Sequence, residues 1–196
     1  MRTCWSLAMS RRYTEIVFTP TVVAAQERGG TRSQASRMEQ MEIDDLHLGE
    51  GEARFLAARD SFYMASISES GWPYLQHRGG PRGFLHVIDE STLAFADFVG
   101  NRQLISTGNF DHDDRVSLFF MDYPGRQRLK VMAHGRVLSP ADDPALAAQL
   151  EDTNYRARIE RLFVFKVEAF DWNCPQHITP RFTAAELEEH DIGGTF

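Results

Sequence analysis

The feature that most limits the fold of this chain is the spacing of its apolar runs, which are short, rich in Phe, Val and Ile, and separated by turn residues. The intervals between them are too short for long intervening helices, and this rhythm is typical of an antiparallel barrel. We therefore predict a mainly β fold with peripheral helices. The predicted strands cover residues 62–68, 72–78, 84–88, 92–97, 116–123, 129–138 and 161–170.

Turn residues join these strands into three hairpins, with turns at 69–71, 89–90 and 124–125. Pro73 lacks the N–H that a central strand needs, so it should lie at the start of its strand or on a sheet edge. Helices are predicted near 20–29, 36–41, 52–59, 101–109 and 140–150, and from Thr183, where Thr183 and Glu186 form a capping-box pattern.

A chain of 196 residues has the length of one domain with appendages. We divide it into a partly helical N-terminal extension (1–50), a barrel domain (51–182), and a short C-terminal helix and tail (183–196). No apolar stretch approaches the length of a membrane span. The apolar part of the first residues is too short for a signal peptide, because Arg11 and Arg12 end it.

The net charge of the chain limits the kinds of partner that it can bind, and its cysteine content indicates the cellular compartment. A formal net charge of -7 with scattered basic residues argues against nucleic-acid binding, which needs clustered Lys and Arg. Cys4 and Cys174 match neither a zinc pattern nor a disulfide framework, which favours a reducing cytoplasm. We expect Cys174 to be buried and inert. The acidic run 111–114 is interpreted as a solvated loop, and no metal site is expected.

The segment 95–103 passes from a predicted strand through a turn containing Gly100 into a predicted helix start. A helix N-terminus presents unpaired N–H groups, and Arg102 adds a guanidinium, so a phosphate could be held here. The alternative is that Asn101 is an ordinary N-cap and Arg102 a solvated residue of the first turn. Spacing alone leaves both open.

Three segments together resemble the pyridoxamine 5'-phosphate oxidase-like family of FMN-binding split barrels, over roughly 55–182. The segment 96–103 is similar to the family's phosphate loop, 114–120 to its Pro-Arg-Val-Ser-Leu-Leu-Phe strand, and 172–182 to its closing segment, which begins with Trp and ends with Arg-Phe. The resemblance implies an antiparallel, Greek-key-like split β-barrel, with FMN as cofactor and a homodimer that holds two flavins at its interface.

The resemblance also assigns the phosphate contacts. Ala96 and Asp97 stand at the family's Tyr-Thr positions, and Arg102 is retained. Gln103 replaces the family's Lys, so the second phosphate cation must come from elsewhere, or the affinity is lower.

Contacts to the flavin ring and ribityl chain are implied for six further residues. Gln76, His77 and Arg78 fall on the strand that runs along the ring, and strand geometry puts Gln76 and Arg78 on one face and His77 on the other. Lys130 falls where the family has a Gln that touches the flavin; the alternative is a solvent-facing Lys. Trp172 and Arg181 complete the pocket across the dimer.

The family's substrate-binding Arg-x-His pair is replaced here by His177-Ile178-Thr179, which argues against oxidation of pyridoxamine phosphate itself. We therefore expect an FMN-dependent oxidoreductase that exchanges a hydride between the flavin nitrogen N5 and an unidentified small molecule, with a nicotinamide cofactor as a candidate electron donor. Two alternatives stay open. One is a non-catalytic flavin- or haem-binding barrel, with an axial ligand among His77, His86, His134 and His177; the other is a deazaflavin in the same barrel.

Overall fold

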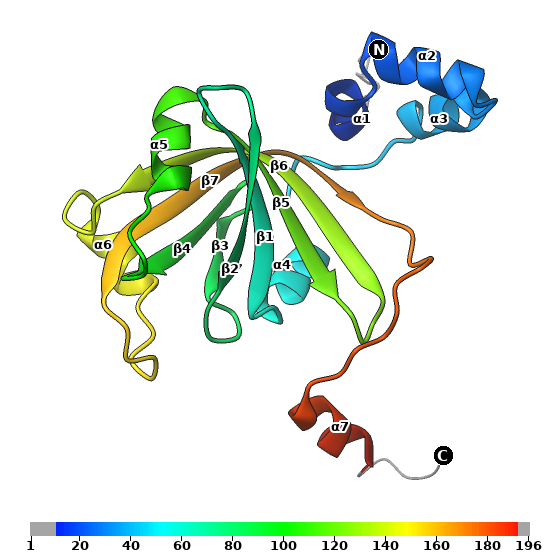
Figure 1. Cartoon of the computed structure of the whole chain (residues 1–196). Coiled ribbons are helices and arrows are strands. Elements are labelled where there is room, and N and C mark those ends of the chain that lie inside the picture. The colour runs from blue at the N-terminus through cyan, green and yellow to red at the C-terminus, as the bar shows by residue number, and fades with distance from the viewer. Residues whose placement is uncertain (1–10, 192–196) are drawn as a thin grey trace, which may run out of the picture.

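The computed structural model describes residues 11–191, and its centre is one antiparallel sheet of seven strands (Figure 1). The strands lie in the order β2-β1-β5-β6-β7-β4-β3. Their bounds are β1 Ser61–Ile67, β2 Pro73–Gly79, β3 Leu85–Asp89, β4 Thr92–Phe98, β5 Arg115–Asp122, β6 Gln127–Leu138 and β7 Ile159–Trp172.

Aromatic contacts show that the sheet curls into a barrel. β1 and β4 are separated by three strands in the sheet order, yet the rings of Phe62 and Phe95 lie 5.6 Å apart, centroid to centroid. Phe84, just before β3, stacks on Phe62 at 5.7 Å. No pairing joins the edge strands β2 and β3 within the described chain, so the barrel is split between them. The prediction of an antiparallel split β-barrel with peripheral helices is confirmed.

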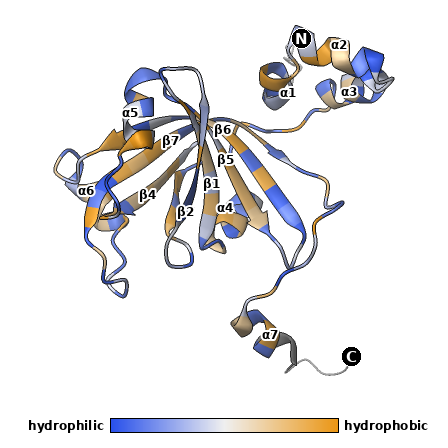
Figure 2. Cartoon of the chain, in the orientation of Figure 1, coloured by the Kyte–Doolittle hydropathy of each residue, from blue (hydrophilic) through white to orange (hydrophobic). Residues whose placement is uncertain are grey.

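The barrel interior is a single apolar core rich in phenylalanine. Phe62, Phe120, Phe163 and Phe165 are almost completely buried, and Phe95 stacks on Phe163 at 5.0 Å. Alternation along each strand sends one side chain inward and the next outward, so the core is built from every second residue. Figure 2 shows hydrophobic residues running along the strands of the barrel, while its loops are largely hydrophilic.

Seven helices lie around the described barrel and at its ends. Their bounds are α1 Arg12–Val17, α2 Pro20–Arg28, α3 Arg32–Glu39, α4 Glu50–Ala57, α5 Ile105–His112, α6 Pro144–Gln149 and α7 Ala184–Asp191. Helix α4 contacts β3, and α5 contacts β1 and β6. The helices α1–α3 stand beyond one end of β6 and β7, while α7 follows an extended arm after β7 (Figure 1).

The first helix is fixed to the barrel by a buried ion cluster. Arg11 lies 3.7 Å from Asp45 and also forms an ion pair with Asp171 at the end of β7. The carboxylate of Asp45 accepts hydrogen bonds from the backbone N–H groups of Arg12 and Tyr13, and therefore caps the start of α1. None of the helices in 11–191 is long and apolar enough to cross a membrane.

Most predicted elements agree with the structure within a few residues, and the differences have local causes. The three hairpins form, Pro73 begins the edge strand β2, and Glu186 accepts a hydrogen bond from the Thr183 N–H as the capping box requires. Helix α1 was missed, because its cap, Asp45, lies far away in the sequence. The helix predicted from Asn101 begins only at Ile105, so neither the N-cap interpretation of Asn101 nor a helix start at Arg102 holds.

Candidate functional site

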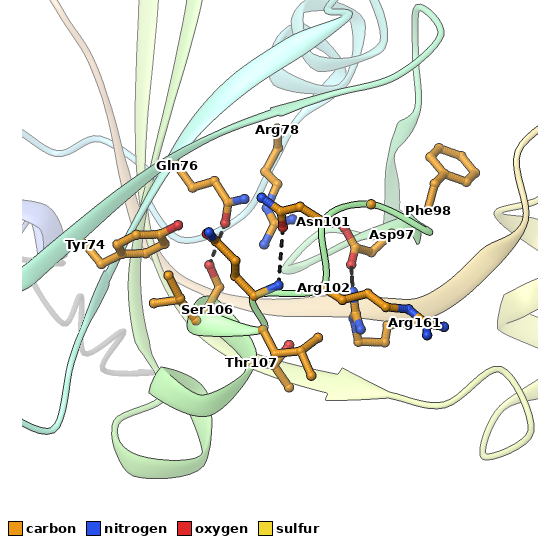
Figure 3. A pocket seen from close by; sticks show the side chains of 14 residues that line it. Tyr74, Gln76, Arg78, Asp97, Phe98, Asn101, Arg102, Ser106, Thr107 and Arg161 are labelled. Atoms are coloured by element: carbon orange, nitrogen blue, oxygen red, sulfur yellow. Dashed lines mark hydrogen bonds and ion pairs between the residues drawn. The ribbon is translucent and has the colours of Figure 1, made fainter.

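A polar pocket of about 280 Å³ lies at the split of the barrel, where the inner face of β2 approaches β4, β7 and the start of α5 (Figure 3). Gln76 and Arg78 come from β2, Asp97 from β4, and Arg161 from β7. The loop 99–104 and the first turn of α5 complete the wall. The other lining residues include Tyr74, Phe98, Asn101, Arg102, Gln103, Ser106 and Thr107.

Asp97 is the centre of the pocket's charge network. Arg78 donates from Nη1 to its Oδ1 at 2.9 Å, and Arg161 donates from Nε and Nη2 to its Oδ2 at 3.0 and 2.6 Å. The Asp97 side chain is 12% exposed, so these contacts are only weakly screened by water. Asp97 and Arg161 are direct partners in the β4–β7 register, which explains how one carboxylate meets a guanidinium at such short range.

Arg78 crosses the split and is held against aromatic rings. Its guanidinium lies 4.8 Å from the centroid of Phe163 and 5.9 Å from that of Phe95, within the range of cation–π attraction. Burial lowers the pKa of Arg78, and Arg161 lowers it further, while Asp97 acts in the opposite direction. The buried Nε of Arg78 has no hydrogen-bond partner within the described chain. A buried cation with spare donors is the expected feature of an anion site.

A β-bulge brings a second carboxylate to the pocket. The register shifts between Asp97 and Phe98, and as a result Glu160 has no partner on β4. Glu160 instead lies 2.7 Å from Nη2 of Arg102 and 3.1 Å from Nη2 of Arg161. Three arginines therefore face two acids, which leaves the cluster with a net charge of +1.

The loop before α5 has unusual backbone geometry. Arg102 and Leu104 have φ angles of 57° and 56°, in the left-handed region that side chains other than Gly rarely adopt. Leu104 stands at the N-cap position of α5 and offers no side-chain cap, so the first N–H groups of the helix face the pocket without one. Local strain of this kind is concentrated at functional sites.

The neutral part of the pocket is formed by Gln76 and its contact on α5. The Gln76 side-chain oxygen accepts a hydrogen bond from the Ser106 hydroxyl at 3.0 Å. This bond fixes the Gln76 amide, so that its NH₂ group is available as a donor beside the arginines (Figure 3).

The structure brings together five of the ten residues that the sequence singles out. Gln76, Arg78, Asp97, Arg102 and Gln103 all line the pocket. The expectation that Gln76 and Arg78 share a face is confirmed.

His77 and Ala96, which are next to pocket residues in the sequence, face away from the pocket. His77 points to the outer face of β2, with its ring 5.8 Å from Tyr63. The buried Ala96 lines a different hollow, beside His86 and Leu150.

The remaining three residues lie elsewhere on the same chain. Lys130 is on β6, opposite Phe119 and Asp171. Trp172 ends β7, where its indole N–H donates to Glu52 at 2.8 Å and its ring meets Phe55 at 4.7 Å.

Arg181 lies on the arm after β7, with its guanidinium 4.9 Å from the centroid of the Tyr123 ring. It lines a second hollow of about 390 Å³, together with Arg59, Tyr63 and Arg82. Within a single chain, therefore, Lys130, Trp172 and Arg181 lie outside the arginine pocket.

Sequence reasoning missed Arg161 and Glu160, although the printed chain contains a signal for them. Both are charged, and they directly precede the apolar run 162–165 of a buried strand. Charged residues at such a position need partners on the neighbouring strand. Asp97, inside the apolar run of β4, is the matching partner.

The histidines and cysteine considered from the sequence lie apart from the arginine pocket. His86 lines the hollow beside Leu150, His134 lies 2.8 Å from Asp114, and neither lines the pocket at the split. Among the described residues no group of three His, Cys, Asp or Glu side chains could hold a metal ion. Cys174 is exposed, so its predicted burial is wrong: it lies on the arm after β7, outside the barrel core. Cys4 lies outside the described residues.

Comparison with known proteins places the barrel in a family. Solved structures similar to this chain include a putative pyridoxamine 5'-phosphate oxidase from Lactobacillus delbrueckii (19% identity, 66% of this chain and 97% of that chain, TM-score 0.49). Another is an FMN-binding protein from Syntrophomonas wolfei (14% identity, 72% and 97%, TM-score 0.48). No curated protein matches the sequence significantly. The family model for pyridoxamine 5'-phosphate oxidase matches residues 49–173, the whole barrel from α4 to the end of β7, and the chain therefore belongs to the pyridoxamine 5'-phosphate oxidase family.

Proposed function

We propose that this protein is an FMN-dependent oxidoreductase that works as a homodimer. The observation that carries the proposal is the arginine pocket at the barrel split, in a chain whose family is established over residues 49–173. The pocket combines positive charge, an uncapped helix start and an ordered amide, which are the elements that a flavin mononucleotide phosphate and its ribityl chain require.

The residues of the pocket fit a phosphate. The cluster of three arginines and two acids keeps a net charge of +1, and the first N–H groups of α5 add a partial positive charge. The orphaned Nε of Arg78 offers a further donor. In this proposal Arg78 and Arg161 bind the phosphate, with Arg102 and the backbone of the loop 99–104 at the rim of the pocket.

When bound, the flavin supplies hydride exchange with a small substrate. The protein's own residues bind the flavin and orient it. Gln76, held by Ser106, presents its amide N–H groups to acceptor atoms of the flavin, and Tyr74 and Phe98 form the sides of the pocket. The aromatic floor of Phe95 and Phe163 excludes water from behind the arginines, which strengthens their attraction for an anion.

The second half of the site comes from the partner subunit in this proposal. A pocket of about 280 Å³ is below the roughly 300–1,000 Å³ typical of small-molecule sites, so one chain encloses only part of a nucleotide-sized ligand. Lys130, Trp172 and Arg181 are the contacts that we assign to the partner.

The outer face of β1 and β2 is suited to a dimer contact. Leu75 on β2 is 66% exposed, and Tyr63 on the neighbouring strand β1 is 38% exposed. An apolar groove on the same side of the sheet is lined by Ile16, Ala65 and Met132. Exposed apolar side chains gathered on one face of a sheet are typical of a contact with another protein surface.

The substrate is a small molecule other than pyridoxamine phosphate in this proposal. The segment His177-Ile178-Thr179 carries one imidazole and no guanidinium, and His177 sits in a left-handed backbone conformation on the exposed arm. A substrate phosphate would find no bidentate cation there.

The test is the visible absorption spectrum of the purified protein after incubation with FMN and gel filtration. We expect a bound flavin spectrum with one FMN per chain, and reduction of that flavin by NADH or NADPH in an anaerobic cuvette. A protein that stays colourless after incubation with excess FMN would contradict the proposal. A Soret band after incubation with haem, with no flavin retained, would favour the haem-binding alternative instead.

A further inference from the structure

We propose that Asp97 is a built-in counter-ion that competes with the flavin phosphate for Arg78 and Arg161, and that these two arginines, rather than Arg102, form the main phosphate clamp. The inference deepens the proposed function and rests on it. It assigns Arg161 as the cation that compensates for Gln103, which stands at a position where the family has Lys.

Hydrogen-bond geometry separates the two buried arginines from Arg102. Asp97 engages Nη1 of Arg78 together with Nε and Nη2 of Arg161. Across the described chain, Nη2 of Arg78 and Nη1 of Arg161 take part in no hydrogen bond, so each guanidinium keeps a donor for a ligand. Glu160 lies close to both Arg102 and Arg161, but the Arg102 side chain is 58% exposed, whereas that of Arg161 is 18% exposed. The attraction of Arg102 for an anion is therefore more strongly screened by water.

The charge balance at Asp97 decides how strongly this clamp holds a phosphate. Two guanidiniums that share one carboxylate carry a net charge of +1, whereas a phosphate monoester approaches a charge of -2 at neutral pH. A carboxylate between the same two arginines repels that phosphate and occupies the donors that the phosphate needs. The family residue at this position, a Thr hydroxyl, would do neither.

Asp97 also has a structural role in the unliganded protein. Arg78 and Arg161 repel each other, and the lowered pKa of Arg78 reflects burial together with this repulsion. Asp97 neutralises the pair, and a bound phosphate could replace it in that role. Removing the carboxylate should therefore destabilise the unliganded protein, as losing one partner of a buried pair usually does, and at the same time strengthen phosphate binding.

The experiment compares the Asp97→Asn and Asp97→Thr variants with Arg161→Gln, and uses Arg102→Gln as the matched arginine control. FMN and riboflavin are titrated by quenching of flavin fluorescence, since the two ligands differ only in the phosphate. Thermal melting is followed with increasing inorganic phosphate as a probe that needs no flavin.

We expect Asp97→Asn and Asp97→Thr to bind FMN about tenfold more tightly, with riboflavin affinity changed less than threefold. Their melting temperature should fall below that of the wild type without phosphate and recover as phosphate is added. Arg161→Gln should weaken FMN binding at least tenfold and leave riboflavin unchanged, while Arg102→Gln should weaken FMN binding less than threefold.

Weaker FMN binding in both Asp97 variants, or a larger loss in Arg102→Gln than in Arg161→Gln, would overturn the inference. If the Asp97 variants do not fold, the comparison of the two arginine variants decides. If the proposed function is wrong but the clamp exists, the wild type would bind no flavin. Inorganic phosphate would still stabilise the wild type in that case, and it would stabilise Arg161→Gln less. If phosphate stabilises the wild type and Arg161→Gln equally, the clamp itself is refuted.

Discussion

The exposed leucine on β2 offers a direct test of the proposed dimer, which would supply the second half of the site. Leu75 is next to Gln76 in the sequence, so its side chain points outward while that of Gln76 points into the arginine pocket. If two copies meet over this face, replacing Leu75 by Ala removes apolar contact area from the interface without touching the pocket.

The expected cost follows from how much of Leu75 is exposed in one chain. Burying a whole leucine side chain contributes about 1.5–3 kcal/mol. Since 66% of Leu75 is exposed, roughly 1–2 kcal/mol per chain depends on the partner covering it. A two-fold interface contains the residue twice, so Leu75→Ala should weaken the dimer by about 2–4 kcal/mol, a factor of roughly 30 to 1,000 in the dissociation constant.

Sedimentation equilibrium over a range of protein concentrations measures this constant. Val22→Ala on α2 is the control, since Val22 is also an exposed apolar residue but lies far from β2 in the sequence and on another element. We expect the control to match the wild type. FMN affinity is measured in parallel. As the protein is diluted, it should decrease only in Leu75→Ala, because the partner would complete the site. An unchanged dissociation constant for Leu75→Ala would refute the proposed dimer face.

Three further predictions concern parts of the fold that support the site. Replacing Arg11, buried and paired with Asp171, by Met should cost about 3–5 kcal/mol of docking free energy and expose α1 to limited proteolysis. Burial lowers the pKa of His86, so the folded protein favours the neutral ring. The free energy of unfolding of the wild type, relative to that of His86→Gln, should therefore fall as the pH drops below about 6.5, the ordinary pKa of the group. Urea denaturation at several pH values measures this difference. Gly135→Ala would place a Cβ 2.8 Å from the Phe110 ring, and a melting temperature lowered by several degrees is expected from about 1–3 kcal/mol of overpacking; an unchanged one would show that Phe110 moves aside freely.

The sequence was sufficient to predict the barrel because its signals are local and repeated. Most strands are short apolar runs, several of them with alternating burial, and the turns between paired strands are marked by Gly, Pro, Asp or Glu. Pro73 was expected at the start of its strand or on a sheet edge, and in the structure it begins the edge strand β2. The family motifs gave the segment 96–103 as part of a site, and the structure places Asp97, Arg102 and Gln103 in one pocket with Gln76 and Arg78.

The sequence could not provide the long-range pairings that determine the charge balance of the pocket. Arg161 is 64 residues away from Asp97, and their hydrogen bonds depend on the register of β4 against β7, which no local pattern sets. The start of α5 was misplaced for a related reason. Gly100 and Asn101 look like a helix start, but three further residues, two of them with positive φ, come before the helix begins at Ile105.

The position of the pocket follows from the split itself. A closed barrel pairs every strand, so no strand edge is left open for a ligand to enter between strands. Here β2 lacks a partner on one side, and Arg78 reaches from its inner face to Asp97 on β4. The same strand turns Leu75 and His77 outward. In the proposed dimer, this one edge strand would contribute its charged face to the ligand pocket and its outer face to the contact with the second chain, so ligand binding and association would depend on the same strand.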